Sequence, residues 1–186
     1  MKGRSVRSIA ISTFSAGALA IAAVAFFGNS RDTLDDVHAS IVGSYPDVMH
    51  ISPAEYSALE DTALLVFDTR ERDEFAVSHL RGAIQVAPDL SAEDFIARYG
   101  DKAQGKIAVF YCSVGVRSSK FAEKVQAQLK AKGAIRVVNL ERGLFGWHND
   151  KRPLVTNGTG NTEAIHPYDE LWGNLIERGQ LTSYTP

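Results

Sequence analysis

Three short apolar runs alternate with amphipathic segments along the chain, and this alternation limits the folds that it can adopt. The runs are LLVF at 64–67, KIAVFY at 106–111 and RVVNL at 136–140. Apolar runs of this length are typical of strands buried on both faces of a parallel sheet. Because helical segments separate the runs, the sequence predicts an α/β sandwich with a mostly parallel central sheet flanked by helices.

Start and stop signals place the helices between these strands. A serine followed three residues later by an acidic residue predicts helix starts at Ser52 and Ser91, with ends near residues 59 and 99. A stripe of apolar residues predicts a longer helix from Ser118 to residue 132, which Gly133 ends. A short helix is expected over 143–149.

The first thirty residues form a separate segment. Three basic residues precede an uncharged stretch over 9–27, which as a helix would span roughly 28 Å, close to the thickness of a bilayer core. The basic residues before it and the acidic residues after it predict a cytoplasmic amino end and an exported domain. We therefore expect the domain in the cell envelope, on the periplasmic side.

Two interpretations of this segment remain open. The stretch 9–27 is either a retained anchor in the inner membrane or a signal peptide, since Ala23-Val24-Ala25 resembles a cleavage site. A helix buried in a soluble domain is a third and weaker interpretation, because the polar residues of the stretch trace no face.

The length of 186 residues and the 45% hydrophobic content suit one packed domain with extensions. We expect four parts along the chain. These are an N-terminal signal peptide or membrane anchor (1–30), a linker or stalk with a short amphipathic helix (31–50), the domain itself (51–155), and a C-terminal extension with a short helix (156–186).

Charge and cysteine content exclude several classes of function. The net charge is -2 and the basic residues are scattered, so nucleic acid is not expected as a partner. The single cysteine, Cys112, cannot form an internal disulfide, and the chain has no Cys/His spacing suited to a metal. Cys112 therefore acts alone or with another molecule.

Cys112 directly follows the second predicted strand, where parallel sheets place their binding sites. The connection from Cys112 to the next helix is so short that it must curl, and its N–H groups then point inward at the start of that helix. We expect these groups to stabilise a nucleophilic thiolate. The predicted substrate-binding residues of the loop are Ser113, Val114, Gly115, Val116, Arg117 and Ser118.

Cys112 and Arg117 also have interpretations without a role in catalysis, and other residues are expected to support the loop. Cys112 could be a buried, inert thiol, and Arg117, which we predict to clamp the substrate, could be an ordinary surface residue. Asp68 and Arg70 follow the first predicted strand, and we expect them to support the loop through hydrogen bonds or a charge pair. The acidic residues that come next are interpreted as a solvated face: Glu71, Asp73 and Glu74.

The segment YCSVGVRS, at 111–118, resembles the active-site loop of rhodanese-like sulfurtransferases, in which a cysteine, two variable residues, a glycine and one further residue precede arginine or threonine. The segments 66–84 and 138–155 are similar to the upstream and downstream signatures of that family. The resemblance covers about 51–155. It implies the α/β sandwich, and it places the catalytic role on Cys112.

The chain departs from the usual pattern of this family at three positions. Ser113 stands where arginine is common, which weakens the case for thiosulfate as the preferred donor. Arg81 replaces a proline, and Arg142 replaces a glycine, so the turns there are expected to differ. Four residues separate Cys112 from Arg117, whereas the related dual-specificity phosphatases have five. The shorter loop implies persulfide chemistry.

The resemblance implies a reaction in two steps. The Cys112 thiolate takes sulfane sulfur from a donor such as thiosulfate or a persulfide, and a thiol or cyanide then accepts it. No metal or organic cofactor is implied. The alternatives are a non-catalytic or sulfur-carrier binding module in an envelope complex, and a phosphatase or arsenate reductase.

Overall fold

The computed structural model describes residues 33–156 and 160–186. The predicted anchor or signal peptide over 9–27 lies outside these residues, so both interpretations stay predictions. Within the described ranges, no helix combines the length and the apolar character that crossing a membrane requires.

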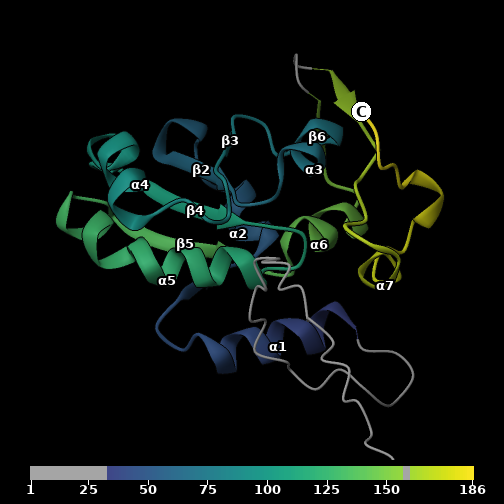
Figure 1. Ribbon diagram of the computed structural model, residues 1–186, viewed down its shortest axis with the longest axis horizontal. Coiled ribbons are helices and arrows are strands. Elements are labelled where there is room, and N and C mark those ends of the chain that lie inside the picture. Colours follow the sequence, from purple (N-terminus) through teal and green to yellow (C-terminus); the bar gives the residue numbers. More distant parts are fainter. Residues whose placement is uncertain (1–32, 157–159) are drawn as a thin grey trace, which may run out of the picture. The chain divides into compact units, whose positions relative to one another are not determined.

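A five-stranded parallel sheet forms the centre of the domain, in the order β1-β5-β4-β2-β3. The three predicted strands are its inner members, and the sequence did not indicate the two short edge strands. The sheet is flanked by helices, which confirms the predicted fold class (Figure 1). The strands are β1 (Met49–Ile51), β2 (Leu64–Asp68), β3 (Ile84–Gln85), β4 (Ile107–Tyr111) and β5 (Arg136–Leu140).

The helices begin close to their predicted caps. The hydroxyl of Ser52 accepts a hydrogen bond from the backbone of Glu55 at 3.2 Å, and that of Ser91 accepts one from Asp94 at 3.0 Å. The helices are α1 (Leu34–Ser44), α2 (Pro53–Ser57), α3 (Arg72–Val77), α4 (Ala92–Tyr99), α5 (Val116–Ala131), α6 (Gly143–Asn149) and α7 (Glu170–Gly173).

Helices α4 and α5 pack on one face of the sheet through an aromatic cluster. Phe95 of α4 contacts Phe67 of β2 at a ring distance of 4.9 Å, Phe110 of β4 at 5.8 Å and Phe121 of α5 at 5.1 Å. All four rings are buried, and burial of each is worth roughly 1.5–3 kcal/mol. This cluster fixes α5, and with it the loop that leads into α5.

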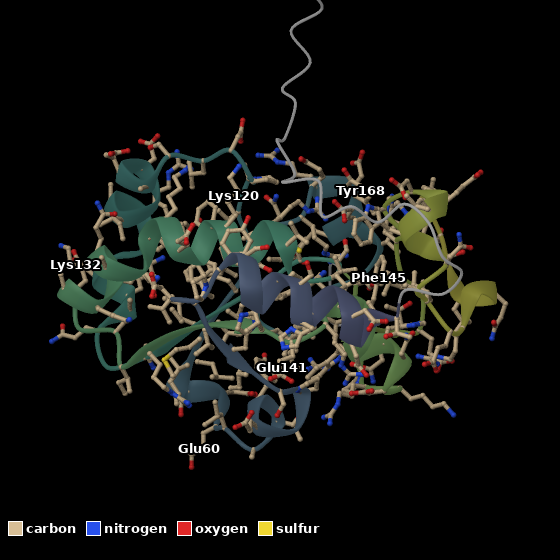
Figure 2. All side chains as sticks on the ribbon, turned by 90° about the horizontal axis from the view of Figure 1, so that it is seen from below. Glu60, Lys120, Lys132, Glu141, Phe145 and Tyr168 are labelled. Atoms are coloured by element: carbon tan, nitrogen blue, oxygen red, sulfur yellow. The ribbon has the colours of Figure 1, made fainter. Side chains whose placement is uncertain are left out.

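Helix α1 is the short amphipathic helix expected within the predicted linker or stalk of residues 31–50, and it packs against the domain. Its stripe of Leu34, Val37 and Ile41 is buried. A free linker would leave this apolar surface in water, which is unfavourable. The ring of His38 contacts that of His50 at 4.8 Å. Figure 2 shows α1 crossing this side of the domain next to Glu141, whose carboxylate lies 4.0 Å from His38.

The C-terminal extension folds back beside α6 (Figure 1). Its strand β7 (Asn161–Thr162) pairs antiparallel with β6 (Leu154–Val155) at the end of the domain. The amide of Asn149 donates to the carbonyl of Leu175 at 2.9 Å, and Ile176 is buried. The predicted amphipathic helix is only the four-residue α7, and Leu171 within it is 68% exposed.

Candidate active site

The carboxyl ends of β2 and β4 lie level, because Asp68 pairs with Tyr111 in the register of the sheet. The backbone N–H of Thr69 donates to the carbonyl of Tyr111 at 2.9 Å. Cys112 therefore leaves the sheet beside Thr69 and Arg70, at the edge where parallel sheets bind ligands.

Helix α5 begins at Val116, two residues before the predicted start at Ser118. Gly115 caps it in the left-handed conformation, with φ 110°, which a residue with a Cβ would resist. A Cβ at Gly115 would also lie 3.2 Å from Nδ2 of Asn139 and 3.3 Å from Cδ1 of Ile41. The earlier start places Arg117 and Ser118 in the first turn of the helix.

The sulfur of Cys112 lies at the amino end of α5. The backbone N–H of Gly115 donates to Sγ at 3.2 Å, and the first N–H groups of a helix have no acceptor within it. The N–H of Gly115 and the dipole of α5 favour negative charge on the sulfur. Cys112 is only 1% exposed, so its burial also fits the inert-thiol interpretation, and a chemical test must separate the two.

The amino end of α6 holds the carbonyl groups of the loop. Leu144 donates to the carbonyl of Cys112 at 2.8 Å, and Phe145 donates to that of Ser113 at 2.9 Å. The close approach needs glycine at Gly143, since a Cβ there would lie 2.5 Å from the carbonyl oxygen of Cys112. Arg142 adopts a left-handed φ of 58°, a conformation that costs about 1 kcal/mol in a residue with a side chain.

Arg117 and Glu74 form a buried ion pair next to the loop. Nη1 of Arg117 donates to Oε2 of Glu74 at 2.7 Å, and Nη2 donates to Oε1 at 2.8 Å. The hydroxyl of Ser113 donates to Oε1 of Glu74 at 2.9 Å and accepts from Arg117 at 3.0 Å. The prediction of a solvated face is therefore wrong for Glu74, and the guanidinium that we predicted to clamp the substrate is occupied by Glu74.

The ion pair determines the charge state of both partners. Burial alone would raise the pKa of Glu74, but the hydrogen bonds and charge of Arg117 outweigh it and hold this pKa below its ordinary value of 4.5. Burial opposes the charge of Arg117, but the hydrogen bonds and charge of Glu74 contribute to outweighing it, and the pKa of Arg117 is raised.

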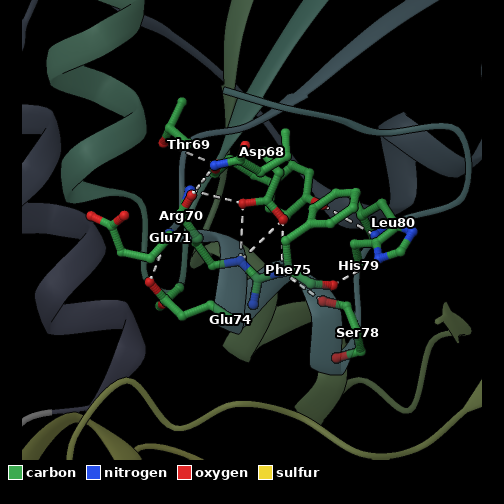
Figure 3. A network of polar contacts seen from close by, with 12 residues as sticks. Asp68, Thr69, Arg70, Glu71, Glu74, Phe75, Ser78, His79 and Leu80 are labelled. Carbon is green, nitrogen blue, oxygen red and sulfur yellow. Dashed lines mark hydrogen bonds and ion pairs between the residues drawn. The ribbon is translucent and has the colours of Figure 1, made fainter. Parts of the chain in front are cut away.

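Asp68 and Arg70 form a second buried ion pair (Figure 3). The Nη2 group of Arg70 donates to Oδ2 of Asp68 and to the carbonyl of Ser78, both at 2.6 Å. Burial disfavours the charged guanidinium, but the carboxylate of Asp68 outweighs it and raises the pKa of Arg70. This pair joins the end of β2 to Ser78, and its support for the Cys112 loop stays a prediction.

A family model described as a rhodanese-like domain matches residues 52–150. The chain belongs to this family. The matched region contains the Cys112 loop, both ion pairs and the turn before α6. The described residues of this rhodanese-like domain hold no cluster of three metal-ligating side chains.

The rhodanese-like domain is also similar to part of several curated proteins. A protein of Staphylococcus haemolyticus named tRNA uridine(34) hydroxylase is 38% identical over 126 residues, which cover 65% of this chain and 37% of that protein. A protein of the same name from Bacillus velezensis is 32% identical over 54% of this chain and 31% of its own length. This chain therefore spans about a third of the length of these relatives.

Two solved structures are similar to this chain at lower identity. A thiosulfate sulfurtransferase from Pseudomonas aeruginosa is 23% identical, with a TM-score of 0.49 over 69% of this chain and 24% of that chain. A Bacillus halodurans protein is 20% identical, with a TM-score of 0.49 over 75% of this chain and 98% of that chain.

Asn139 is a residue of the rhodanese-like domain that the sequence reasoning missed. It is buried on β5, and its Oδ1 accepts a hydrogen bond from the hydroxyl of Ser118 at 2.5 Å. Its Nδ2 lies 3.3 Å from Nδ1 of His50, and Ser118 also donates to the carbonyl of Gly115 at 3.1 Å. A polar residue inside the apolar run 136–140 was the signal that could have identified it.

Proposed function

We propose that this rhodanese-like domain is a sulfurtransferase in which Cys112 carries a sulfane sulfur. The observation that carries the proposal is the N–H of Gly115 directed at Sγ of Cys112 over 3.2 Å, at the start of α5. A thiolate placed there is a nucleophile stabilised by fixed dipoles. It needs no histidine base.

The proposed reaction is a pair of sulfur transfers. The Cys112 thiolate attacks the outer sulfur of a donor, a bond forms from Sγ to that sulfur, and the donor's sulfur–sulfur bond breaks with the electron pair on the leaving group. A thiol or cyanide then attacks the outer sulfur of the Cys112 persulfide and restores the thiolate. The backbone N–H groups of Ser113 to Ser118 stabilise both anions.

A binding module that holds a sulfur carrier or an envelope complex is the second candidate. The burial of Cys112, which is 1% exposed, favours it, because an unreactive structural thiol is normally buried. In that case sulfur would not load from any donor.

The name of the curated relatives points to RNA as a further substrate, which we do not propose for this chain. Its 20 basic and 22 acidic residues give no net positive charge, and nucleic-acid binding rests mainly on positive charge against phosphate. Binding of tRNA at physiological salt would contradict this view.

A turnover assay tests the proposed function. With at least one sulfur donor, we expect the wild-type protein to convert cyanide to thiocyanate, or to pass the donor's sulfane sulfur to a thiol, from which excess thiol releases sulfide as it is oxidised to disulfide. The variant Cys112→Ser should lose this activity, and the control Asp73→Asn, on an exposed residue, should keep it. Equal turnover by wild type and Cys112→Ser would contradict the proposal.

We also propose that residues 9–27 direct the domain to the periplasmic side of the inner membrane, as an anchor or as a cleaved signal peptide. Protease treatment of spheroplasts, followed by detection of the domain, tests this location. Protection of the domain until the membrane is dissolved would contradict it.

A further inference from the structure

Four buried charged side chains lie at the edge of the sheet that carries Cys112, and their charges cancel. The side chains of Asp68 and Arg70 are fully buried as one pair. Those of Glu74 and Arg117 are 3% and 11% exposed as the other. Each guanidinium is therefore matched by one carboxylate, so the side-chain charges of the two pairs sum to zero, although Nη1 of Arg70 has no hydrogen-bond partner among the described residues.

The C-terminal extension closes a further face of Arg117. The ring of Tyr168 lies 4.8 Å from the guanidinium carbon, in the geometry of a cation–π contact. The backbone N–H of Tyr168 donates to Nδ1 of the buried His166 at 3.0 Å, and Tyr168 has a left-handed φ of 68°. Arg117 is thus held by Glu74 through its N–H groups and by Tyr168 over its plane.

We infer that the sulfur donor of this site is an organic persulfide, with at most one negative charge, rather than the thiosulfate dianion. This inference rests on the proposed sulfurtransferase function. The sulfur of Cys112 is buried, so a donor must lose most of its water to reach it. A dianion loses far more hydration than a monoanion, and the partial positive charge at the start of α5, roughly half an elementary charge, compensates a monoanion better than a dianion.

The step balances with the persulfide alone. The Cys112 thiolate attacks the outer sulfur of R–S–S⁻, a bond forms from Sγ to that sulfur, and the original sulfur–sulfur bond breaks. The products are the Cys112 persulfide anion and R–S⁻, which leaves with the electron pair. Two negative charges stand on each side, and no oxidant or reductant is consumed.

The test compares rates of sulfur addition to Cys112 from thiosulfate and from glutathione persulfide, followed by intact-mass spectrometry. The variant Glu74→Gln keeps the size of the side chain and frees one positive charge beside the loop. We expect it to raise the ratio of the thiosulfate rate to the persulfide rate by about tenfold or more. The two donors differ in intrinsic reactivity, but this difference is the same for both proteins. It therefore cancels when the rate ratio of Glu74→Gln is divided by the rate ratio of wild type.

Asp73→Asn is the matched control, since it removes the same charge from an exposed residue one position away. Its ratio should stay at the wild-type value. An equal ratio in wild type, Asp73→Asn and Glu74→Gln would overturn the inference.

A second measurement needs only the wild-type protein. Because the side-chain charges of the site cancel, the partial charge at the start of α5 should bind the sulfate dianion more weakly than the persulfide monoanion, so sulfate at the same concentration as the persulfide should leave its loading unchanged. Competition by sulfate would overturn the inference. If neither donor adds sulfur to Cys112, the proposed sulfurtransferase function is wrong. If thiosulfate loads Cys112 faster than the persulfide does, only the inference about the donor is wrong.

Discussion

Glu74 of α3 and Arg117 of α5 form a buried ion pair in which each carboxylate oxygen accepts a hydrogen bond from the guanidinium, at 2.7 and 2.8 Å. The pair joins α3 to the first turn of α5. It also holds the hydroxyl of Ser113, which contacts both partners. The stability of the domain and the shape of the Cys112 loop therefore depend on the same two residues.

Removal of one partner of the Glu74–Arg117 ion pair should destabilise the folded domain. We expect Glu74→Ala to lower the free energy of unfolding by roughly 3–5 kcal/mol, because Arg117 is left buried without a counter-charge. Urea denaturation measures the change. The control Asp73→Ala, on an exposed residue, should stay within about 0.5 kcal/mol of wild type. Similar losses in both variants would show that the pair contributes little.

His50 should make stability depend on pH. Burial and the neighbouring His38 lower the pKa of His50 from 6.5 to about 4, so the folded state favours the neutral ring that faces Asn139. The unfolded chain binds a proton on His50 at higher pH than the folded chain does, so stability falls as pH drops from about 6.5 to about 4 and then levels off.

The variant His50→Gln isolates this contribution, because it keeps an acceptor for Asn139 without a titrating ring. Its free energy of unfolding, measured by denaturation from pH 7 to pH 4, should decline less steeply than that of wild type. Parallel curves for the two proteins over this window would contradict the assignment.

Gly143 and Gly82 provide a matched pair of glycines with left-handed φ values of 55° and 74°. An alanine Cβ at Gly143 would meet the carbonyl oxygen of Cys112 at 2.5 Å, whereas at Gly82 it meets nothing within 4 Å. We expect Gly82→Ala to cost about 1 kcal/mol from the backbone alone. Gly143→Ala should cost roughly 2–4 kcal/mol and slow sulfur loading. Equal costs in thermal unfolding would argue against the close approach.

Ser118 and Ser119 are adjacent buried serines with different surroundings. The hydroxyl of Ser118 bonds to Asn139 and Gly115, while that of Ser119 has no hydrogen-bond partner among the described residues. We expect Ser118→Ala to lower stability by about 1–3 kcal/mol, because Oδ1 of Asn139 loses its donor, and to slow sulfur loading. Ser119→Ala should be nearly neutral. A reversed order of the two effects would refute a positioning role for Asn139.

The inner strands could be predicted because β2, β4 and β5 are buried and leave continuous apolar runs. The edge strands β1 and β3 were missed because three and two residues are too few to show a period. Helix α3 was missed because its acidic first turn was interpreted as a solvated face. Its N-cap and third residue, Glu71 and Glu74, form a capping box.

The Cys112 loop was predictable because its geometry is local, from the strand end through Gly115 to α5. The predicted start of α5 is two residues late, because the amino-acid sequence alone does not show that Gly115 is the N-cap. The partners Glu74 and Asn139 lie 43 and 21 residues from the loop residues that they contact. No local pattern reports contacts over such separations.

The most direct measurement is the intact mass of the protein after incubation with persulfide or thiosulfate. We expect wild type to gain the mass of one sulfur atom, cyanide or a thiol to remove it, and Cys112→Ser to gain none. If wild type gains no sulfur from either donor, or if Cys112→Ser gains it equally, Cys112 is not the sulfur carrier.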